Sequence, residues 1–335
     1  MKKKYGDLIN LRAIAILMVM FGHSIILYSS KWSLYEPANQ SPFFDYIKRF
    51  IDAIQMPLFF SLSGYLYVFT CKKYTFRTML IDKVKRLLIP YIMVSSLYMV
   101  PIRMLLKYNG YAGMSYFSVL LEKIVLGGDN GHLWYLPALF LIFVGIGIYF
   151  IIIDKQKIKC TVAYIILLAA GVFLNYFRNV FHSGITFLSN AQMYLLYFFE
   201  GYLICIYKDK IDFAKSIKTG RVITFILFSA VSGASIYLNK TNFVISVTLV
   251  ICTYILIPRN TNRVMEFIDK NSFGLYLFHS PLIYFMFVYM PDINPWMFAL
   301  IGFVGLGSIA LGITLFIRKI GLGIEHQSDR NILVI

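Results

Sequence analysis

The sequence predicts an all-α protein, a polytopic bundle of about ten transmembrane helices. Of its 335 residues, 59% are hydrophobic and only 14% are charged, whereas soluble domains carry about 25% charged residues. Apolar runs recur along the whole chain, each close to the roughly 20 residues needed to cross a bilayer. Short clusters of Lys, Arg, Asn and Gly separate the runs, which is the layout of a helical membrane bundle.

Ten apolar runs account for the predicted spans. The first run is too long for the apolar part of a signal peptide and lacks a small-residue cleavage site, so we expect it to stay in the mature chain. Because ten is an even number of crossings, both termini lie on the same side of the membrane. In chain order, the predicted spans are 8–28, 50–70, 87–106, 133–153, 160–177, 191–207, 222–238, 243–258, 272–290 and 296–317.

The distribution of basic residues places both termini in the cytoplasm. Of the 32 Lys and Arg residues, 24 fall in segments that this orientation puts inside, although the outer segments are longer. The positive-inside rule describes such an excess, which also accounts for the net charge of +16 without a nucleic-acid partner. The segments placed inside are 1–12, 71–86, 154–159, 208–221, 259–271 and the tail.

The spans form one predicted membrane domain, residues 1–320, followed by a short cytoplasmic tail at 321–335. No internal repeat divides the chain, and the four cysteines form no CxxC pair that would indicate a disulfide framework or a zinc site. Two outer segments look structured. Residues 42–56 have the pattern of an amphipathic helix that leads into the second span, and the Gly-rich residues 107–132 end in His-Leu-Trp-Tyr. Either segment could shape an external cleft.

The first predicted helix carries two ionisable residues, Arg12 and His23. An ionisable group within a span costs several kcal/mol, so each one is a functional candidate. Eleven residues make about three helical turns plus roughly 20°, which puts both side chains on one face about 16 Å apart along the axis. The alternative is that Arg12 reaches the phosphate headgroups and that His23 only hydrogen-bonds a neighbouring helix.

Three further positions also have two interpretations. Ser63 lies among small residues in the second span, where close helix packing is the plain explanation. Arg86 is the basic residue nearest the membrane in its inner segment, where it either anchors the topology or meets the phosphates of an anionic ligand. Glu200 lies deep in the sixth span, where its carboxylate is costly unless it is paired, protonated or next to water.

A cluster of aromatic residues and one histidine begins the fourth span. Trp134 and Tyr135 are typical of the aromatic belt at a membrane interface, whereas His132 beside them has no such role. In the ninth span His279 precedes Pro281, which we expect to kink the helix. The sequence assigns no role to His279.

Five short stretches, in order and spread over nearly the whole chain, form a larger pattern. They are Leu11-Arg-Ala-Ile-Ala with His23, Pro57-Leu-Phe-Phe-Ser-Leu-Ser-Gly-Tyr65, Arg86 with Pro90-Tyr91, His132-Leu-Trp-Tyr-Leu, and Ser272-Phe-Gly-Leu-Tyr-Leu-Phe-His279. Together they resemble the acyltransferase 3 family of bacterial integral membrane acyltransferases. In size and in its Phe-Phe-Ser-Leu-Ser-Gly stretch, the chain looks most like the single-domain members that decorate surface polysaccharides. We expect it to lack the extracytoplasmic hydrolase-like domain that some other members append.

The resemblance implies O-acyl transfer at the bacterial plasma membrane. The expected donor is cytoplasmic acetyl-CoA or another acyl-CoA, and the expected acceptor is a hydroxyl of an extracytoplasmic or lipid-linked glycan. By position, the essential Arg and His of the family's first helix correspond to Arg12 and His23. The donor serves as a substrate, and we expect no bound cofactor and no metal ion.

Roles for individual residues follow from the chemistry of acyl transfer. His23 is the candidate general base for the acceptor hydroxyl, because histidine exchanges protons near neutral pH. An acyl-histidine intermediate is a less direct alternative. Arg12 and Arg86, with Tyr91 beside it, are candidates for binding the donor, whose phosphates suit the planar guanidinium. Candidates for the acceptor side are His132, Trp134, Tyr135, Ser63 and Glu200.

A transporter or exporter of a glycan or lipid-linked intermediate is the alternative function. Transporters often show repeats and paired broken helices around a site at the membrane midplane. The sequence shows neither feature. A sensor or assembly protein, whose polar residues only pack helices, would require the alignment of Arg12 with His23 to be accidental.

Overall fold

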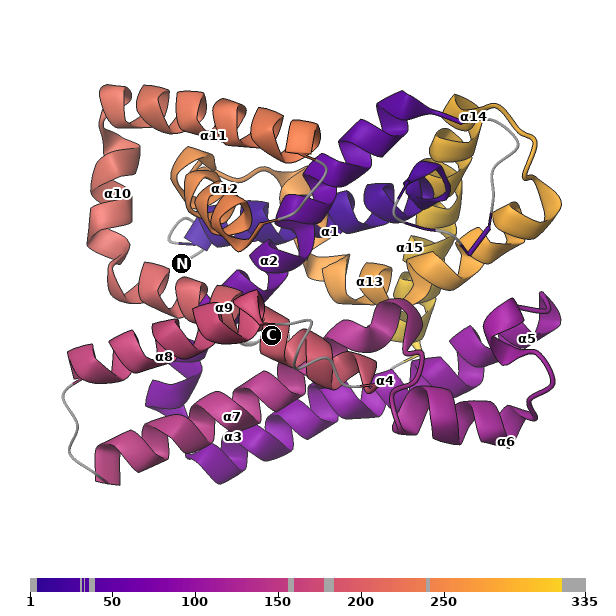
Figure 1. The fold of residues 1–335 in the computed structure, drawn as a ribbon, viewed down its shortest axis with the longest axis horizontal. Helices are drawn as coiled ribbons and strands as arrows, with labels where there is room; N and C mark the ends of the chain where they lie inside the picture. The colour runs from indigo at the N-terminus through magenta and orange to yellow at the C-terminus, as the bar shows by residue number, and fades with distance from the viewer. Residues whose placement is uncertain are drawn as a thin grey trace. The chain divides into compact units, whose positions relative to one another are not determined.

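The computed structural model describes residues 5–30, 32, 34–35, 40–155, 160–177, 184–238 and 242–320. Throughout these ranges the regular structure is helical and contains no strand (Figure 1), so the predicted all-α class is confirmed. The chain forms two compact units, Met1–Leu62 with Ile206–Asn331, and Ser63–Cys205 with Ile332–Ile335. We describe each unit by itself. The predicted cytoplasmic tail lies outside the described residues.

Seven helices of the described chain are long and apolar enough to cross a membrane, which makes the protein a multi-pass membrane protein. The other three predicted spans fall on the helices α8 (Cys160–Tyr176), α9 (Thr186–Ile206) and α12 (Phe243–Leu256). The count of ten crossings and the cytoplasmic side of the termini stay predictions. The seven long helices are Gly6–Ser24, Pro42–Lys73, Phe76–Leu105, Gly131–Lys155, Lys218–Leu238, Arg263–Tyr289 and Pro295–Lys319.

The first unit is organised around α13, which packs against α1 on one side and α15 on another. Small residues allow close approach: a Cβ on Gly274 of α13 would lie 2.3 Å from the side chain of Thr314 in α15. The amphipathic segment predicted at 42–56 and the second span are one continuous helix, α2 (Pro42–Lys73), which continues into the second unit. The other elements of the first unit are α1 (Gly6–Ser24), η2 (Ile26–Tyr28), α10 (Lys208–Ser216), α11 (Lys218–Leu238), α12, α13 (Arg263–Tyr289), α14 (Pro295–Leu300), η8 (Ile301–Gly305) and α15 (Leu306–Lys319).

The second unit contains one long helical stretch, Phe76–Leu105, which is interrupted by two π-helical turns, η3 (Val84–Leu88) and η4 (Ser95–Met99). Each turn is followed within two residues by a proline, Pro90 or Pro101. Proline has no N–H to donate and its ring crowds the carbonyl four residues earlier, so a local π turn lets the helix continue. The segments between and after the turns are α3 (Phe76–Lys83), α4 (Ile89–Val94) and α5 (Val100–Leu105).

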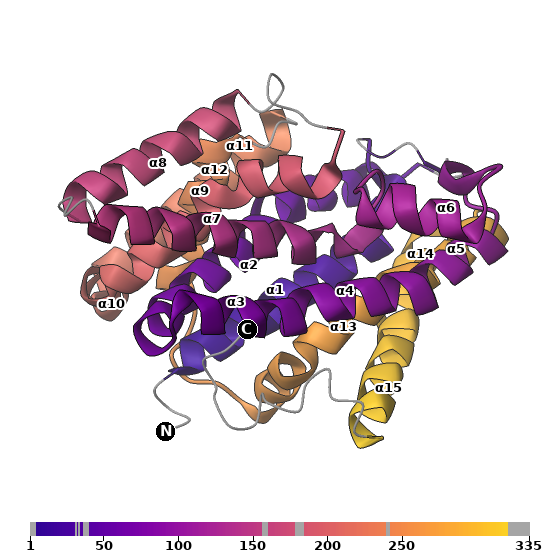
Figure 2. The same cartoon turned by 90° about the horizontal axis from the view of Figure 1, so that it is seen from below.

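The segment 107–132, predicted as an outer connection, folds back along this stretch (Figure 2). The Tyr116 hydroxyl donates to the carbonyl of Ser96 at 2.8 Å, and the Tyr91 hydroxyl donates to the carbonyl of Ile124 at 2.7 Å. The segment therefore returns from the end of α5 as far as Tyr91, and it is built as packed helical turns. The remaining elements of this unit are η5 (Asn109–Tyr111), α6 (Tyr116–Ser118), η6 (Val119–Val125), η7 (Gly131–Trp134), α7 (Tyr135–Lys155), α8 and α9.

Candidate active site

Helix α1 presents Arg12 and His23 to the same neighbouring helix, α13. Arg12 contacts Asp269, and His23 contacts His279. The two contacts are eleven residues apart on α1 and ten residues apart on α13, in the same order along both helices. The two helices therefore run parallel, with an ionisable pair near each end of their contact. The sequence predicted the shared face on α1 but not the helix that this face meets.

The first pair is a two-pronged ion pair. Arg12 Nε donates to Asp269 Oδ1 at 2.6 Å, and its Nη2 donates to Oδ2 at 2.9 Å. The two side chains are 12% and 13% exposed, so the charges are largely removed from solvent and strongly favour each other. The planar fork of arginine fits a carboxylate in this way, which the ammonium group of lysine cannot copy.

The second pair consists of two imidazoles in hydrogen-bond contact. His23 Nδ1 lies 2.6 Å from His279 Nε2. The ring centres are 4.9 Å apart and the ring planes differ by only 14°. The distance between the centres exceeds the distance between the two nitrogens by about the width of one ring, so each nitrogen lies on the line that joins the centres. The rings therefore meet edge to edge in one plane, as an in-plane hydrogen bond requires. His279 is buried, whereas His23 is partly exposed.

The donor-side candidates lie in the second unit and are hydrogen-bonded within it. Arg86 is in the π turn η3, where its Nε donates to Asp82 Oδ1 at 2.9 Å one helical turn away. The Tyr91 hydroxyl donates to the Ile124 carbonyl and accepts a short hydrogen bond from the Asn130 side chain. Tyr91 thus anchors the returning segment, and a role in binding the donor stays a prediction for both residues.

Three of the acceptor-side candidates make aromatic or hydroxyl contacts in the second unit. The hydroxyls of Ser63 and Tyr135 are 2.9 Å apart and both side chains are buried. Trp134 is partly exposed, and its ring centre lies 5.3 Å from that of Tyr194 on α9. The fourth candidate, His132, is buried in the 3₁₀ turn η7. Tyr194 was not predicted as a site residue, because its distance from Trp134 depends on how α9 packs.

The fifth acceptor-side candidate, Glu200, is a buried carboxyl group on α9. Its side chain is 6% exposed, and neither carboxyl oxygen has a hydrogen-bond partner among the described residues. A buried polar group without a partner costs roughly 1–3 kcal/mol. Buried groups of this kind are retained where a ligand, an ion or water meets them. The sequence expectation that Glu200 is costly at this depth therefore agrees with its surroundings.

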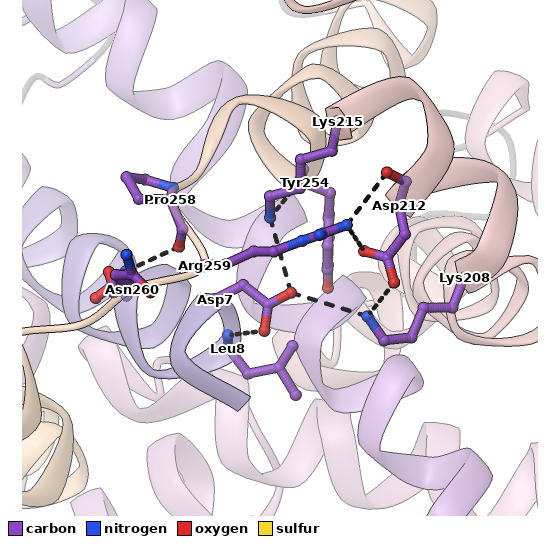
Figure 3. Close-up of polar contacts among 10 residues, drawn as sticks. Asp7, Leu8, Lys208, Asp212, Lys215, Tyr254, Pro258, Arg259 and Asn260 are labelled. Atoms are coloured by element: carbon purple, nitrogen blue, oxygen red, sulfur yellow. Dashed lines mark hydrogen bonds and ion pairs between the residues drawn. The ribbon is translucent and has the colours of Figure 1, made fainter. Parts of the chain in front are cut away.

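A cluster of charged residues fixes the beginning of α1 in the first unit (Figure 3). We call Asp7, Lys208, Asp212, Lys215 and Arg259 the ionic cluster. Lys208 Nζ lies 2.9 Å from Asp212 Oδ2, Arg259 Nη2 lies 3.1 Å from Asp212 Oδ1, and Lys215 Nζ lies 3.7 Å from Asp7 Oδ2. The cluster joins three parts of the chain: α1, α10, and the connection between α12 and α13.

Two groups of the ionic cluster that lie outside the spanning helices have shifted pKa values. Burial is the largest influence on Lys215 and lowers the pKa of its ammonium group, although the charge of Asp7 opposes the shift. For Asp212, burial alone raises the pKa of the carboxyl group. The hydrogen bond from Lys208 and the charges of Lys208 and Arg259 outweigh burial, so the pKa of Asp212 ends below its ordinary value of 3.8.

The carbonyl groups of the connection after α12 hold α1 from a second side. Asn10 Nδ2 donates to the carbonyls of Pro258 at 3.0 Å and Asn260 at 2.9 Å. A Cβ on Gly6 would lie 2.2 Å from the carbonyl oxygen of Arg259, so glycine is required there. The start of the helix that carries Arg12 and His23 is therefore fixed by both backbone and side-chain contacts. Within the described ranges, no three His, Cys, Asp or Glu residues are grouped to hold a metal ion.

The fold and these pairs define the class of the protein: a multi-pass helical membrane protein with an Arg–Asp pair and a His–His pair between two parallel helices. The family model for an acyltransferase domain, Acyl_transf_3, matches residues 5–317. The chain belongs to this family and is a membrane acyltransferase. No curated protein and no solved structure gives a match. Family membership decides for an acyltransferase over the alternative of a transporter.

Proposed function

We propose that the protein transfers an acyl group, most simply acetyl, from a cytoplasmic acyl-CoA to a hydroxyl of an extracytoplasmic or lipid-linked glycan. We place it in the bacterial plasma membrane, where both substrates meet. The observation that carries this proposal is the arrangement on α1: an acid–base imidazole, His23, and a guanidinium, Arg12, point to the same partner helix within an acyltransferase domain.

The chemical step needs one base and no covalent enzyme intermediate. His23 takes the proton of the acceptor hydroxyl while its oxygen bonds to the acyl carbon of the thioester. The tetrahedral intermediate then loses CoA as the carbon–sulfur bond breaks. The sulfur takes the proton from the His23 imidazolium, so the products are the acylated glycan and CoA thiol. A partly exposed imidazole suits this role, because the hydroxyl must reach its ring nitrogen.

Arg12 and Arg86 are the proposed contacts of the donor phosphates. The ion pair with Asp269 engages Nε and Nη2 of Arg12, which leaves the N–H groups of Nη1 for a phosphate oxygen. Arginine binds phosphate through such charge-assisted hydrogen bonds. For Tyr91 we propose an indirect contribution, because its hydroxyl already bonds to Ile124 and Asn130. It would fix the returning segment that precedes the acceptor-side residues.

The acceptor side is proposed at His132, Trp134, Tyr135, Ser63 and Glu200. The partly exposed ring of Trp134 offers a face on which a sugar ring can stack. The buried carboxyl of Glu200 has no hydrogen-bond partner among the described residues. Sugar hydroxyls are donors that would satisfy it. The Ser63–Tyr135 hydroxyl pair supports the start of α7, directly after the turn η7 that holds Trp134 and His132.

Transfer of radiolabel from acetyl-CoA to cell-surface polysaccharide tests the proposal. Membranes would carry the wild type, His23→Ala, or the control His182→Ala, all at matched expression. His182 lies between the predicted spans 160–177 and 191–207. We expect label with the wild type and the control, and a loss of about 10²–10⁴-fold with His23→Ala, the usual contribution of a general base. Undiminished transfer by a folded His23→Ala protein would remove His23 from the mechanism. No transfer from acetyl-CoA or succinyl-CoA by the wild type would refute the proposed reaction.

A further inference from the structure

The hydrogen bonds around His279 determine which of its ring nitrogens carries a proton. His279 Nδ1 lies 2.9 Å from the carbonyl oxygen of Leu275 and 3.0 Å from that of Tyr276. A carbonyl oxygen can only accept a hydrogen bond, so Nδ1 of His279 is the donor. In the neutral imidazole only one nitrogen carries a proton. The other nitrogen, Nε2, therefore carries a lone pair directed away from these carbonyls.

The same reasoning passes from His279 to His23. The lone pair of His279 Nε2 faces His23 Nδ1 at 2.6 Å, edge to edge in nearly the same plane. A hydrogen bond at this distance needs one donor and one acceptor, so the proton lies on His23 Nδ1. In the neutral pair, His23 Nε2 then carries the lone pair that can accept a proton. The backbone carbonyls of α13 therefore determine which ring nitrogen carries the proton, first in His279 and then in His23.

We propose that His279 is a positioning residue that holds neutral His23 in the Nδ1–H tautomer, with Nε2 directed to the acceptor hydroxyl. The inference deepens the proposed function, and only its catalytic consequence rests on that function. In serine hydrolases a buried carboxylate holds the catalytic histidine in the same tautomer. Here a buried imidazole, 2% exposed and held by two carbonyls, would perform that task for the partly exposed His23.

The replacement of His279 by two different side chains separates positioning from packing. His279→Leu keeps an apolar side chain in the buried site but removes the acceptor. His279→Gln keeps an acceptor, because its side-chain oxygen can take the place of Nε2. Ser280→Ala, at the next residue of α13, which is also buried, is the matched control. All three proteins are prepared at full length in lipid nanodiscs.

The tautomer of His23 is read by ¹⁵N NMR of the full-length protein with ring-labelled histidine, at about pH 8.5, well above the ordinary histidine pKa. The chain has five histidines, and loss of a signal pair in His23→Gln assigns His23. In the wild type, His279→Gln and Ser280→Ala, we expect a protonated Nδ1 and an unprotonated Nε2. In His279→Leu we expect Nε2 to gain the proton in most molecules, together with about a hundredfold slower transfer.

Two results would overturn the proposal: a protonated Nε2 on His23 in the wild type, or an unchanged Nδ1–H tautomer in folded His279→Leu. If His279→Leu fails to fold, His279→Gln decides, because a His23 that changes tautomer despite the retained acceptor contradicts the assignment. The tautomers do not depend on any substrate. Expected tautomers with no acyl transfer by the wild type would therefore refute the proposed function alone.

Discussion

At the scale of single residues, the ion pair between Arg12 and Asp269 gives a prediction about arginine itself. Arg12→Lys keeps the positive charge but cannot make two parallel hydrogen bonds. We expect a loss of about 1.5–3 kcal/mol in the free energy of unfolding, the contribution of one hydrogen bond to a charged group. Thermal unfolding in detergent measures it. The control is Arg77→Lys, at an exposed arginine of α3. Equal losses in both variants would contradict the special role of the fork.

Removal of the Asp269 carboxylate should lower the free energy of unfolding more than Arg12→Lys does. Asp269→Asn leaves the guanidinium of Arg12 largely buried without its counter-charge. Breaking a buried pair from one side costs about 3–5 kcal/mol, so we expect a clearly lower melting temperature and little folded protein. The double variant Arg12→Met with Asp269→Leu should recover stability but not transfer. If the double variant were as unstable as Asp269→Asn, the cost would not come from the unpaired charge.

The sequence predicted the face of α1 and its two ionisable residues, because helical periodicity is a local property. It did not predict their partners, which lie 257 and 256 residues further along the chain. Asp269 belonged to a predicted inner segment, and His279 stood out only as an ionisable residue in a span. The pairing depends on α1 packing in parallel with α13, and no local pattern encodes that. Roles of the individual site residues stay predictions that the proposed assays test.

At the scale of helices, Gly64 controls how closely α2 and α9 approach within the second unit. A Cβ at this position would lie 1.7 Å from the backbone carbonyl oxygen of Phe198, which cannot be accommodated without moving the helix. We expect Gly64→Ala to lower the melting temperature sharply and to abolish transfer. The matched control is Gly145→Ala on α7, where a Cβ meets nothing within 4 Å. That variant should be neutral or stabilised by about 0.5–1 kcal/mol. Equal behaviour of the two variants would refute this packing.

The ionic cluster gives α10 a pH-dependent contact with the connection between α12 and α13, because Asp212 pairs with Arg259. Because the pKa of Asp212 is lowered in the folded protein, its carboxylate stabilises the fold at pH values above its ordinary pKa of 3.8. The contribution is lost as pH falls through the lowered pKa. At pH 7, Asp212→Asn should therefore have a lower free energy of unfolding than the wild type, by about 1 kcal/mol or less for this partly exposed group. Its melting temperature should be lower accordingly. The difference should shrink as the pH falls towards and through the lowered pKa of Asp212.

Melting curves from pH 7 to pH 3 in detergent measure this effect. The control is Asp154→Asn, an exposed carboxylate at the end of α7 that has no ion pair within the described part of the chain. Its variant should follow the wild type at every pH. A constant offset of Asp212→Asn down to pH 3 would show that its contribution is packing and not charge.

The helices themselves were predictable from the sequence, whereas the connection 107–132 was not. Each of the ten predicted spans falls on a helix of the structure, because about 20 apolar residues in lipid have few other conformations. The predicted outer segment instead returns to Tyr91 through hydrogen bonds from Tyr91 and Tyr116 to backbone carbonyls. Such bonds join residues whose spacing follows no period. Composition alone indicated only that the segment is Gly-rich and structured.

At the scale of the whole molecule, the predicted topology places both termini and Cys71 in the cytoplasm. Cys71 is exposed at the end of α2. In intact cells a membrane-impermeant maleimide should leave it unlabelled, because the predicted segment 71–86 faces inward. In a cysteine-free background, Asp292→Cys in the connection before α14 should label readily. Labelling of Cys71 in intact cells without permeabilisation would reverse the predicted orientation.

The parallel direction of α1 and α13 agrees with this topology. Two spans that run the same way across a membrane need an odd number of crossings between them, and the ten-span prediction places seven there. The number of crossings between α1 and α13 depends on whether the three helices α8, α9 and α12 cross the membrane as predicted. A cysteine scan of the connections beside these helices would measure it. An even number of crossings between α1 and α13 would contradict the parallel contact.

The distance along the chain between His23 and His279 has a consequence for biosynthesis. At a synthesis rate of about 5–20 residues per second, the ribosome needs roughly 10–50 seconds to travel the 256 residues between them. Throughout that time Arg12 and His23 already sit in the bilayer or the translocon without Asp269 and His279. A nascent chain that stops before α13 has neither pair, so under the proposed mechanism it would not consume acyl-CoA. Under the same proposal, activity would begin only when nearly the whole polypeptide has been inserted.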